Sequence, residues 1–196
     1  MPSVVLVDSG GTNIGSVRYA LERLGVEAHL SDDAAKIRAA KHVILPGVGA
    51  AAPGMTRLRE AGLVDVVRGL TQPVLGVCLG MQLLFEHSEE SDTACLGLIP
   101  GSLRRFTSAT LRVPHMGWNA LQPRRSHALL SGIDTDAFAY FVHSYAAPVG
   151  DHTLASTHYG EEFSAVVQWR NFFGVQFHPE RSAAVGARLL QNFVEL

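Results

Sequence analysis

The chain has 196 residues, 47% of them hydrophobic, and a formal net charge of −2 at pH 7. We expect one globular domain over 1–196 that buries roughly 70% of the surface exposed by the unfolded chain. The charged residues are scattered, which argues against a nucleic-acid surface. The start of the chain lacks the basic and apolar regions of a signal peptide, and no apolar run approaches the ~18 residues of a membrane span, so we expect a cytoplasmic protein.

In the first half of the chain, apolar strand-like runs alternate with helical patterns. This alternation predicts a mostly parallel, open α/β sheet with helices on both faces. The first predicted strand is 4–7, and a helix over about 14–24 follows it. The next predicted strands are 26–30 and 42–45. Asn13 is a plausible N-cap of that helix and Gly25 its stop signal. Ser31 or Asp32 could cap a short helix before the third strand.

The next apolar run leads into a cysteine, in Gly76-Val77-Cys78-Leu79-Gly80-Met81-Gln82. Glycines two residues before and two after the cysteine are typical of a nucleophile elbow, where a strand turns sharply into a helix and a Cβ would collide with its neighbours. The helix that starts at Leu79 would aim backbone N–H groups at the sulfur and favour the thiolate. The alternative is a buried, inert cysteine, which the flanking glycines disfavour.

After the elbow, the polar residues 86–93 predict a surface loop. Several short alternating runs follow within 101–168, and they suggest antiparallel extensions of the same sheet; examples are 137–142, 153–157 and 165–168. The closing helix carries one apolar stripe, formed by Val185, Leu189 and Phe193, with Ser182 near its start.

A histidine near the end of the chain follows a short strand-like run at 174–177, which Pro179 terminates. His178 therefore belongs to the carboxyl edge of the sheet, where open α/β sheets form their active sites. Glu180 is spaced to turn back and accept the second N–H of the imidazole. Cys78, His178 and Glu180 would then act as nucleophile, base and orienting carboxylate. The alternative is a capped turn that opens the last helix.

The other histidines lack the spacing of a zinc pair and have no cysteine partner, so we expect no metal and no cofactor. Cys78 and Cys95 have no Cys-x-x-Cys spacing, so Cys78 should be a free thiol. We expect structural, hydrogen-bonded roles for His115 and His143.

The elbow, taken together with His178 and Glu180, resembles the class I glutamine amidotransferases, in which the cysteine forms a thioester with glutamine and releases ammonia. Three further stretches narrow the resemblance to glutaminase subunits of histidine biosynthesis: Pro46-Gly47-Val48-Gly49, Pro114-His115-Met116-Gly117-Trp118-Asn119 and Tyr140-Phe141-Val142-His143-Ser144-Tyr145. The fold implied is the flavodoxin-like sheet of that family. The first loop, with Ser9-Gly10-Gly11-Thr12 before Asn13, departs from the more typical Tyr-Gly-x-Gly.

Roles for individual residues follow from position and from this resemblance. The N–H of Leu79 follows the nucleophile and is one oxyanion donor by position. The resemblance implies the second donor in the turn at Val48 and Gly49, which would otherwise be an ordinary glycine-rich turn. It also implies two sets of contact residues, Gly47, Gln82, Ser144 and Tyr145 for glutamine, and Asn13, Tyr140 and Arg181 for a partner.

The implied partner is a TIM-barrel cyclase in a heterodimer, which uses the ammonia to make imidazole glycerol phosphate and aminoimidazole carboxamide ribotide. Two alternatives stay open. The chain could serve a different ammonia acceptor, against which 114–119 and 140–145 argue. It could also be an inactive binding subunit that has kept the fold. The intact Cys78, His178 and Glu180 argue against that, and trapping Cys78 with a glutamine-analogue electrophile would decide.

Overall fold

The computed structural model describes residues 4–8, 14–107 and 111–196, so the expectations for Asn13 and for 9–12 lie outside the described residues. The strands of the main sheet are β1 (Val4–Val7), β2 (Ala28–Ser31), β3 (His42–Gly47), β4 (Val74–Cys78), β9 (Gln122–Pro123), β12 (Thr153–Tyr159), β13 (Glu161–Trp169) and β14 (Phe172–Val175). The helices are α1 (Ile14–Arg23), α2 (Ala34–Ala39), α3 (Ala51–Glu60), α4 (Val64–Arg68), α5 (Leu79–Leu83) and α6 (Ala183–Val194). Short 3₁₀ turns are formed by η1 (Glu90–Asp92), η2 (Ala128–Leu130) and η3 (Pro179–Arg181).

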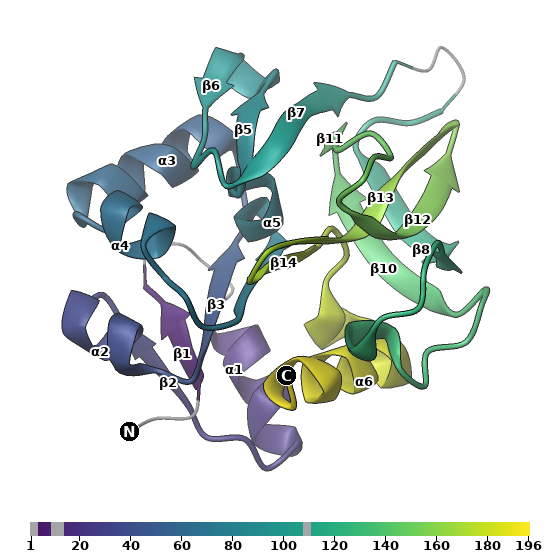
Figure 1. The fold of residues 1–196 in the computed structure, drawn as a ribbon. Helices are drawn as coiled ribbons and strands as arrows, with labels where there is room; N and C mark the ends of the chain where they lie inside the picture. The colour runs from purple at the N-terminus through teal and green to yellow at the C-terminus, as the bar shows by residue number, and fades with distance from the viewer. Residues whose placement is uncertain (1–3, 9–13, 108–110) are drawn as a thin grey trace.

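The main sheet has the strand order β2-β1-β3-β4-β14-β13-β12-β9 (Figure 1). The first five strands of that order are parallel, and β13, β12 and β9 add to them antiparallel. This is the predicted sheet with its antiparallel extension. Because β14 pairs with β4, the end of the chain lies beside the strand that carries Cys78.

Helices cover both faces of the sheet, as a parallel sheet requires. On one face, buried residues of α1 and α6 share a hydrophobic cluster, and the predicted stripe of α6 contributes Leu189 and Phe193 to it. On the other face, buried residues of α2, α3, α4 and α5 form the second cluster, which includes Met55 and Leu58 of α3. The structure thus adds α3 and α4 in 50–72, a stretch for which the sequence pattern predicts no element.

The prediction of a loop at 86–93 is wrong. This segment forms β5 (Phe85–Ser88), η1 and β6 (Thr93–Ala94). With β7 (Ile99–Arg105) and β11 (Tyr145–Ala146) they make a second sheet, of order β11-β7-β5-β6. The polar sequence is misleading because Phe85 and Ser88 are buried while the residues between them face outward.

The prediction of extensions of one sheet is right for 153–157 and 165–168, which lie in β12 and β13, but wrong for 137–142. That run is β10 (Phe138–His143), which pairs antiparallel with β8 (His115–Ala120) in a separate two-stranded sheet. Alternation of apolar and polar residues identifies a strand with one exposed face, but it does not identify the strand's neighbour.

The predicted cap of the short helix before the third strand also differs. The side chain of Asp33, not of Ser31 or Asp32, accepts hydrogen bonds from the first backbone N–H groups of α2. Ser182 makes no side-chain cap on α6; its hydroxyl donates to the His178 carbonyl and accepts from the N–H of Tyr140. Within the described residues, no helix is long and apolar enough to cross a membrane.

Candidate active site

Cys78 is the last residue of β4, directly before α5, and has φ +53° and ψ −108°, a backbone conformation that a non-glycine residue adopts only under constraint. The constraint comes from close packing of the two flanking glycines. A Cβ on Gly76 would lie 2.6 Å from the backbone of Gly80, and a Cβ on Gly80 would lie 1.8 Å from the carbonyl oxygen of Leu45. The predicted steric reason for both glycines is confirmed.

The side chain of Cys78 lines a cavity of about 200 Å³ at the carboxyl ends of the parallel strands. The cavity is lined by Val48, Gly49, Cys78, Leu79, Gln82, Glu90, Val142, His143, Ser144, Tyr145 and His178. A larger depression, of about 430 Å³, lies around η2 and contains neither Cys78 nor His178. We therefore place the candidate active site in the smaller cavity, which holds the strained cysteine.

His178 reaches this cavity from the segment between β14 and η3, and Glu180 lies directly behind it. The imidazole Nδ1 is 2.9 Å from Oε1 of Glu180, whose side chain is 1% exposed. Burial lowers the pKa of His178, but hydrogen bonds and charge interactions with Cys78 and Glu180 outweigh it and raise the pKa to about 10. The structure therefore favours an imidazolium ring beside the sulfur at neutral pH.

The two predicted oxyanion segments meet at the cavity. Leu79 begins α5, and Val48 and Gly49 follow β3; all three residues line the cavity wall. Gly49 has φ +96° and open space around the position of a Cβ, so a side chain there would be strained by the backbone and not by a clash. Gly47 pairs with Cys78 across β3 and β4 but packs toward α5, outside the cavity lining.

Buried amides run from the sulfur toward the far wall of the cavity. Nε2 of Gln176 lies 3.8 Å from Cys78 Sγ, and its Oε1 accepts from Nε2 of Gln82 at 3.0 Å. The same Gln82 nitrogen donates to the Tyr145 carbonyl oxygen at 2.9 Å. Gln176 is not identifiable from the sequence, because one glutamine in an apolar run carries no signal without its neighbours in space.

The family model described as "Glutamine amidotransferase class-I" matches residues 5–196, a range that contains every element of this cavity. The chain belongs to the class-I glutamine amidotransferase family. It is also 59% identical over 197 residues to "Imidazole glycerol phosphate synthase subunit HisH" of Xanthomonas axonopodis pv. citri (strain 306), with 100% of this chain and 98% of that protein covered. A protein of the same name from Xylella fastidiosa (strain Temecula1 / ATCC 700964) is 55% identical with the same coverage.

Solved structures agree with the fold of the family. One, described as a glutamine amidotransferase, superposes with a TM-score of 0.75 at 23% identity and covers 97% of both chains. Another, described as PurLQS from Thermotoga maritima, gives a TM-score of 0.75 at 18% identity and covers 99% of this chain and 98% of that one. At these identities the likeness concerns the fold.

Glu90 lines the cavity of this glutamine amidotransferase, and the sequence pattern does not identify it. It belongs to η1, within the segment predicted as a loop, and its Oε2 accepts from the N–H of Ala51 at 2.7 Å. That hydrogen bond holds the carboxylate at the cavity wall beside the start of α3. The pairing of β5 with β7 places η1 beside the cavity, and no local sequence pattern predicts that pairing.

His143 and His115 are hydrogen-bonded and buried, in keeping with their predicted structural roles. His143 Nδ1 lies 2.8 Å from the Tyr145 carbonyl oxygen, so this nitrogen carries the proton and donates it. His143 Nε2 lies 3.3 Å from His115 Nδ1. Burial is the main reason why the pKa of His143 is lowered to about 3, and the charges of His115 and His178 add to it. His143 is therefore neutral where His178 is charged.

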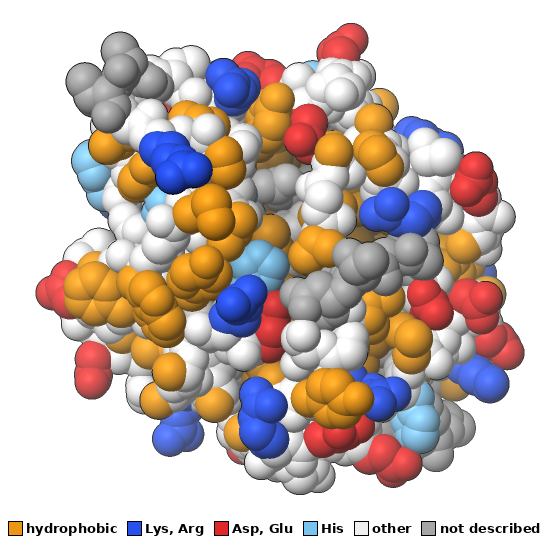
Figure 2. All heavy atoms as spheres, turned by 180° about the vertical axis from the view of Figure 1, so that it is seen from behind, with side chains coloured by type: hydrophobic (Ala, Val, Ile, Leu, Met, Phe, Trp, Pro, Cys, Tyr) orange, Lys and Arg blue, Asp and Glu red, His pale blue; other side chains and the backbone are white. Residues whose placement is uncertain are grey.

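Beside the cavity, β8 and β10 expose an apolar surface, which we call the β8–β10 patch: Met116, Trp118, Phe138 and Tyr140. The first three are 56%, 50% and 56% exposed. Figure 2 shows hydrophobic side chains gathered on this flank of the molecule. The guanidinium carbon of Arg181 lies 5.3 Å from the Tyr140 ring centroid, so two of the three predicted partner residues lie together, while Asn13 is outside the described residues.

Among the residues that the structure describes, no group of three or more His, Cys, Asp or Glu side chains is arranged to hold a metal ion.

Proposed function

We propose that this chain is the glutaminase subunit of an imidazole glycerol phosphate synthase, folded as one domain over 1–196 and working in the cytoplasm. The observation that carries the proposal is the juxtaposition of the strained Cys78 with His178, whose other ring nitrogen is held by Glu180. Full-length similarity to HisH subunits supports the choice among glutamine amidotransferases.

In the proposed reaction, the sulfur of Cys78 attacks the carboxamide carbon of glutamine after His178 has taken the thiol proton. The tetrahedral intermediate expels ammonia, which receives its proton from His178, and a glutamyl thioester remains on Cys78. Water, deprotonated by His178, attacks the thioester, releases glutamate and returns the thiol. Glu180 keeps the imidazole in the orientation that both proton transfers need.

Negative charge develops on the carboxamide oxygen in both steps, and the N–H of Leu79 is one donor to it. The turn at Val48 and Gly49 would supply the second. Removal of one such donor typically costs about 2.7–4 kcal/mol of transition-state stabilisation. The space beside Gly49 and its positive φ support a backbone that can rotate a peptide N–H toward the substrate.

Recognition of the amino-acid end of glutamine falls to the opposite wall. Gln82 uses its amide nitrogen on the Tyr145 carbonyl and on Gln176, so its Oε1 is the group offered to a donor such as the α-ammonium. The carboxylate of Glu90 provides the matching negative charge. Ser144 and Tyr145 would contact the substrate through their backbone, which His143 fixes through the Tyr145 carbonyl.

The proposed partner is a cyclase subunit of TIM-barrel fold that forms a heterodimer with this chain on the β8–β10 patch. Exposed aromatic side chains beside an arginine are typical of residues that dominate protein interfaces. The patch adjoins the cavity, because the Tyr140 carbonyl accepts from the N–H of His178. The cyclase would use the ammonia to form imidazole glycerol phosphate and aminoimidazole carboxamide ribotide. No cofactor is needed for the glutaminase step.

The test separates the two half-reactions in the assembled complex. Cys78→Ala should abolish synthesis from glutamine, while ammonium salts at high pH, where free NH₃ is available, should still support the cyclase. The control is Cys95→Ala, which should keep both activities because Cys95 is buried away from the cavity lining. Loss of both activities in a correctly assembled Cys78→Ala complex would refute the division of labour, and full glutaminase activity would refute the nucleophile.

A further inference from the structure

The orientation of the buried amides near Cys78 is fixed by one main-chain acceptor. A carbonyl oxygen cannot donate, so the Gln82 side chain must present its nitrogen to the Tyr145 carbonyl, 2.9 Å away. The same nitrogen lies 3.0 Å from the Gln176 side chain, which must therefore turn its oxygen toward Gln82. The remaining end of the Gln176 amide is its NH₂ group, and this group faces the sulfur.

His143 strengthens this anchor. Its Nδ1–H donates to the same Tyr145 carbonyl at 2.8 Å, and its ring is buried and neutral. With two donors on one oxygen, rotation of the peptide at Tyr145 would break both hydrogen bonds. Gln176 itself is fully buried, so water does not compete for its amide. The direction of the amide is thus set by the protein and not by the state of the sulfur.

Cys78 Sγ has contacts of opposite character on two sides. The NH₂ of Gln176 lies 3.8 Å from it, and the carbonyl oxygen of Val142 lies 3.8 Å away as well. A thiol can donate its proton to Val142, whereas a thiolate is repelled by that carbonyl and stabilised by the N–H of Gln176. Without Gln176, the thiolate would lose this stabilisation, and the neutral thiol would become more stable relative to it.

We propose that Gln176 is a further residue of the glutaminase reaction, whose amide N–H stabilises the thiolate of Cys78 at the end of the anchored Gln176–Gln82–Tyr145 chain. The inference rests on the proposed function, since it concerns the nucleophile of that reaction. The proton that leaves Cys78 passes to His178, so that the thiolate lies between the imidazolium and the amide. If His178 were neutral, the amide alone would stabilise the thiolate less than the amide and the imidazolium do together.

Other charged or titratable groups that face the sulfur must be considered with it. His178 favours the thiolate, whereas Glu90 on the cavity wall opposes it. His143 lies on the wall in its neutral form, and Glu180 acts through His178. The Gln176 amide is uncharged, so its contribution does not change with pH, and its replacement by an apolar side chain should lower the reactivity of Cys78 without adding an ionisable group.

The experiment measures the rate of alkylation of Cys78 by iodoacetamide between pH 5 and 10, with the modified peptide identified by mass spectrometry. Cys95 is distinguished by its own peptide, and burial raises the pKa of its thiol to about 11. Gln176→Met and Gln176→Leu both remove the two polar ends of the side chain and add no ionisable group. Gln168→Met is the control, because Gln168 donates to the Arg170 carbonyl outside the cavity.

Both Gln176 variants should lower the rate of Cys78 alkylation at pH 7 by about tenfold or more, as expected for loss of one hydrogen bond to a charged atom. Gln168→Met should leave the rate unchanged. Unchanged alkylation rates in folded Gln176 variants would overturn the proposal and leave a packing role. If neither variant folds, Gln82→Met tests the same chain, and an unchanged rate there would also overturn it. Alkylation needs no glutamine, so failure here is distinct from failure of the Cys78→Ala test of function.

Discussion

Tyr140 and His178 are joined through the backbone: the His178 N–H donates to the Tyr140 carbonyl oxygen at 2.9 Å. Tyr140 belongs to the β8–β10 patch, and its ring lies beside Trp118 and Arg181. His178 is the proposed base. A partner that binds the patch therefore contacts β10, the strand to which the backbone of His178 is hydrogen-bonded. One hydrogen bond thus connects the docking surface with the base.

Trp118→Ala should weaken association with the cyclase while the glutaminase activity of the isolated chain stays unchanged. Trp118 is 50% exposed on the patch and does not line the cavity. Truncation of a central interface tryptophan typically costs 2 kcal/mol or more, which is about a 30-fold loss of affinity. Titration calorimetry with the purified partner measures this. Leu30→Ala, on the distant edge strand β2, is the control, and equal losses from both variants would contradict the proposed docking surface.

Gly49→Pro should reduce the activation of glutamine hydrolysis by the partner and its bound acceptor. Glutamine hydrolysed without an acceptor is wasted, so we expect the isolated chain to be slow and the complex with an acceptor analogue to be fast. Proline fixes φ near −65° and so prevents the observed φ of +96°, which removes one of the two backbone states that a switch requires.

Steady-state hydrolysis by the chain, the complex and the complex with acceptor analogue provides the measurement. Gly49→Ala should have the same effect more weakly. Gly97→Ala is a matched control, since Gly97 also has positive φ with open space around it but lies outside the cavity. Equal kcat/KM in all three wild-type states would eliminate the switch.

Glu180→Gln should lower kcat for glutamine hydrolysis by orders of magnitude, yet leave more activity than Cys78→Ala. The base survives, but the carboxylate that fixes its tautomer and stabilises its charge is gone. Exposed Glu161→Gln on β13 serves as the control. A Glu180→Gln enzyme as inactive as Cys78→Ala would show that the carboxylate does more than orient the imidazole.

The stability of the chain should fall as the pH drops below about 6.5, in part because of His143. Its folded pKa is lowered to about 3, so between these pH values the unfolded chain binds a proton that the folded chain does not. Linkage then gives a loss of about 2 kcal/mol by pH 5 from this residue. Urea unfolding at pH 7, 6 and 5 measures the free energy of unfolding. It should fall less with decreasing pH in His143→Asn than in wild type, and as much as in wild type in the control, exposed His158→Asn. The same slope in wild type and His143→Asn would exclude this contribution.

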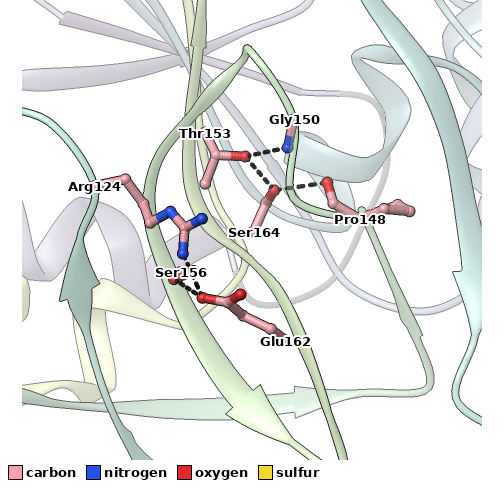
Figure 3. Close-up of polar contacts among 7 residues, drawn as sticks. All are labelled: Arg124, Pro148, Gly150, Thr153, Ser156, Glu162 and Ser164. Carbon is pink, nitrogen blue, oxygen red and sulfur yellow. Dashed lines mark hydrogen bonds and ion pairs between the residues drawn. The ribbon is translucent and has the colours of Figure 1, made fainter.

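Ser164→Ala should destabilise the fold without lowering glutaminase activity per folded molecule. Figure 3 shows the Ser164 hydroxyl between β12, β13 and the turn before them, where it donates to the Pro148 carbonyl at 2.9 Å and lies 2.8 Å from Thr153 Oγ1. Unpaired buried groups cost roughly 1–3 kcal/mol. Thermal unfolding should show the loss, while Ser126→Ala, on an exposed loop, should not. A loss of activity at unchanged stability would contradict the assignment.

Local sequence was sufficient for the elbow and for the His178–Glu180 pair, because glycines at 76 and 80 and proline at 179 impose their geometry within a few residues. It was sufficient for the class of sheet as well, since alternating strands and helices have few arrangements.

It was not sufficient for residues whose role depends on a remote neighbour. Glu90 reaches the cavity only because β5 pairs with β7, and Gln176 acquires a direction only from the Tyr145 carbonyl. The separate sheet of β8 and β10 was not predicted for the same reason, because the sequence pattern of a strand does not identify the strand that pairs with it. The cap of α2 shows the limit of local rules, since Ser31, Asp32 and Asp33 are all suitable residues and only Asp33 has the geometry.

The position of β14 has a consequence for how the protein is made on the ribosome. β14 lies between β4 and β13 in the sheet, but it is synthesised after both. Until it emerges, β4 of a nascent chain can pair with β3 on one side only, so the reactive cysteine stands at the end of a strand with one open edge, with neither His178 nor Glu180 present. Such an edge can pair wrongly with other chains. Synthesis order thus postpones glutamine cleavage until the last strand is in place, and makes the interval before its arrival the period of greatest risk of aggregation.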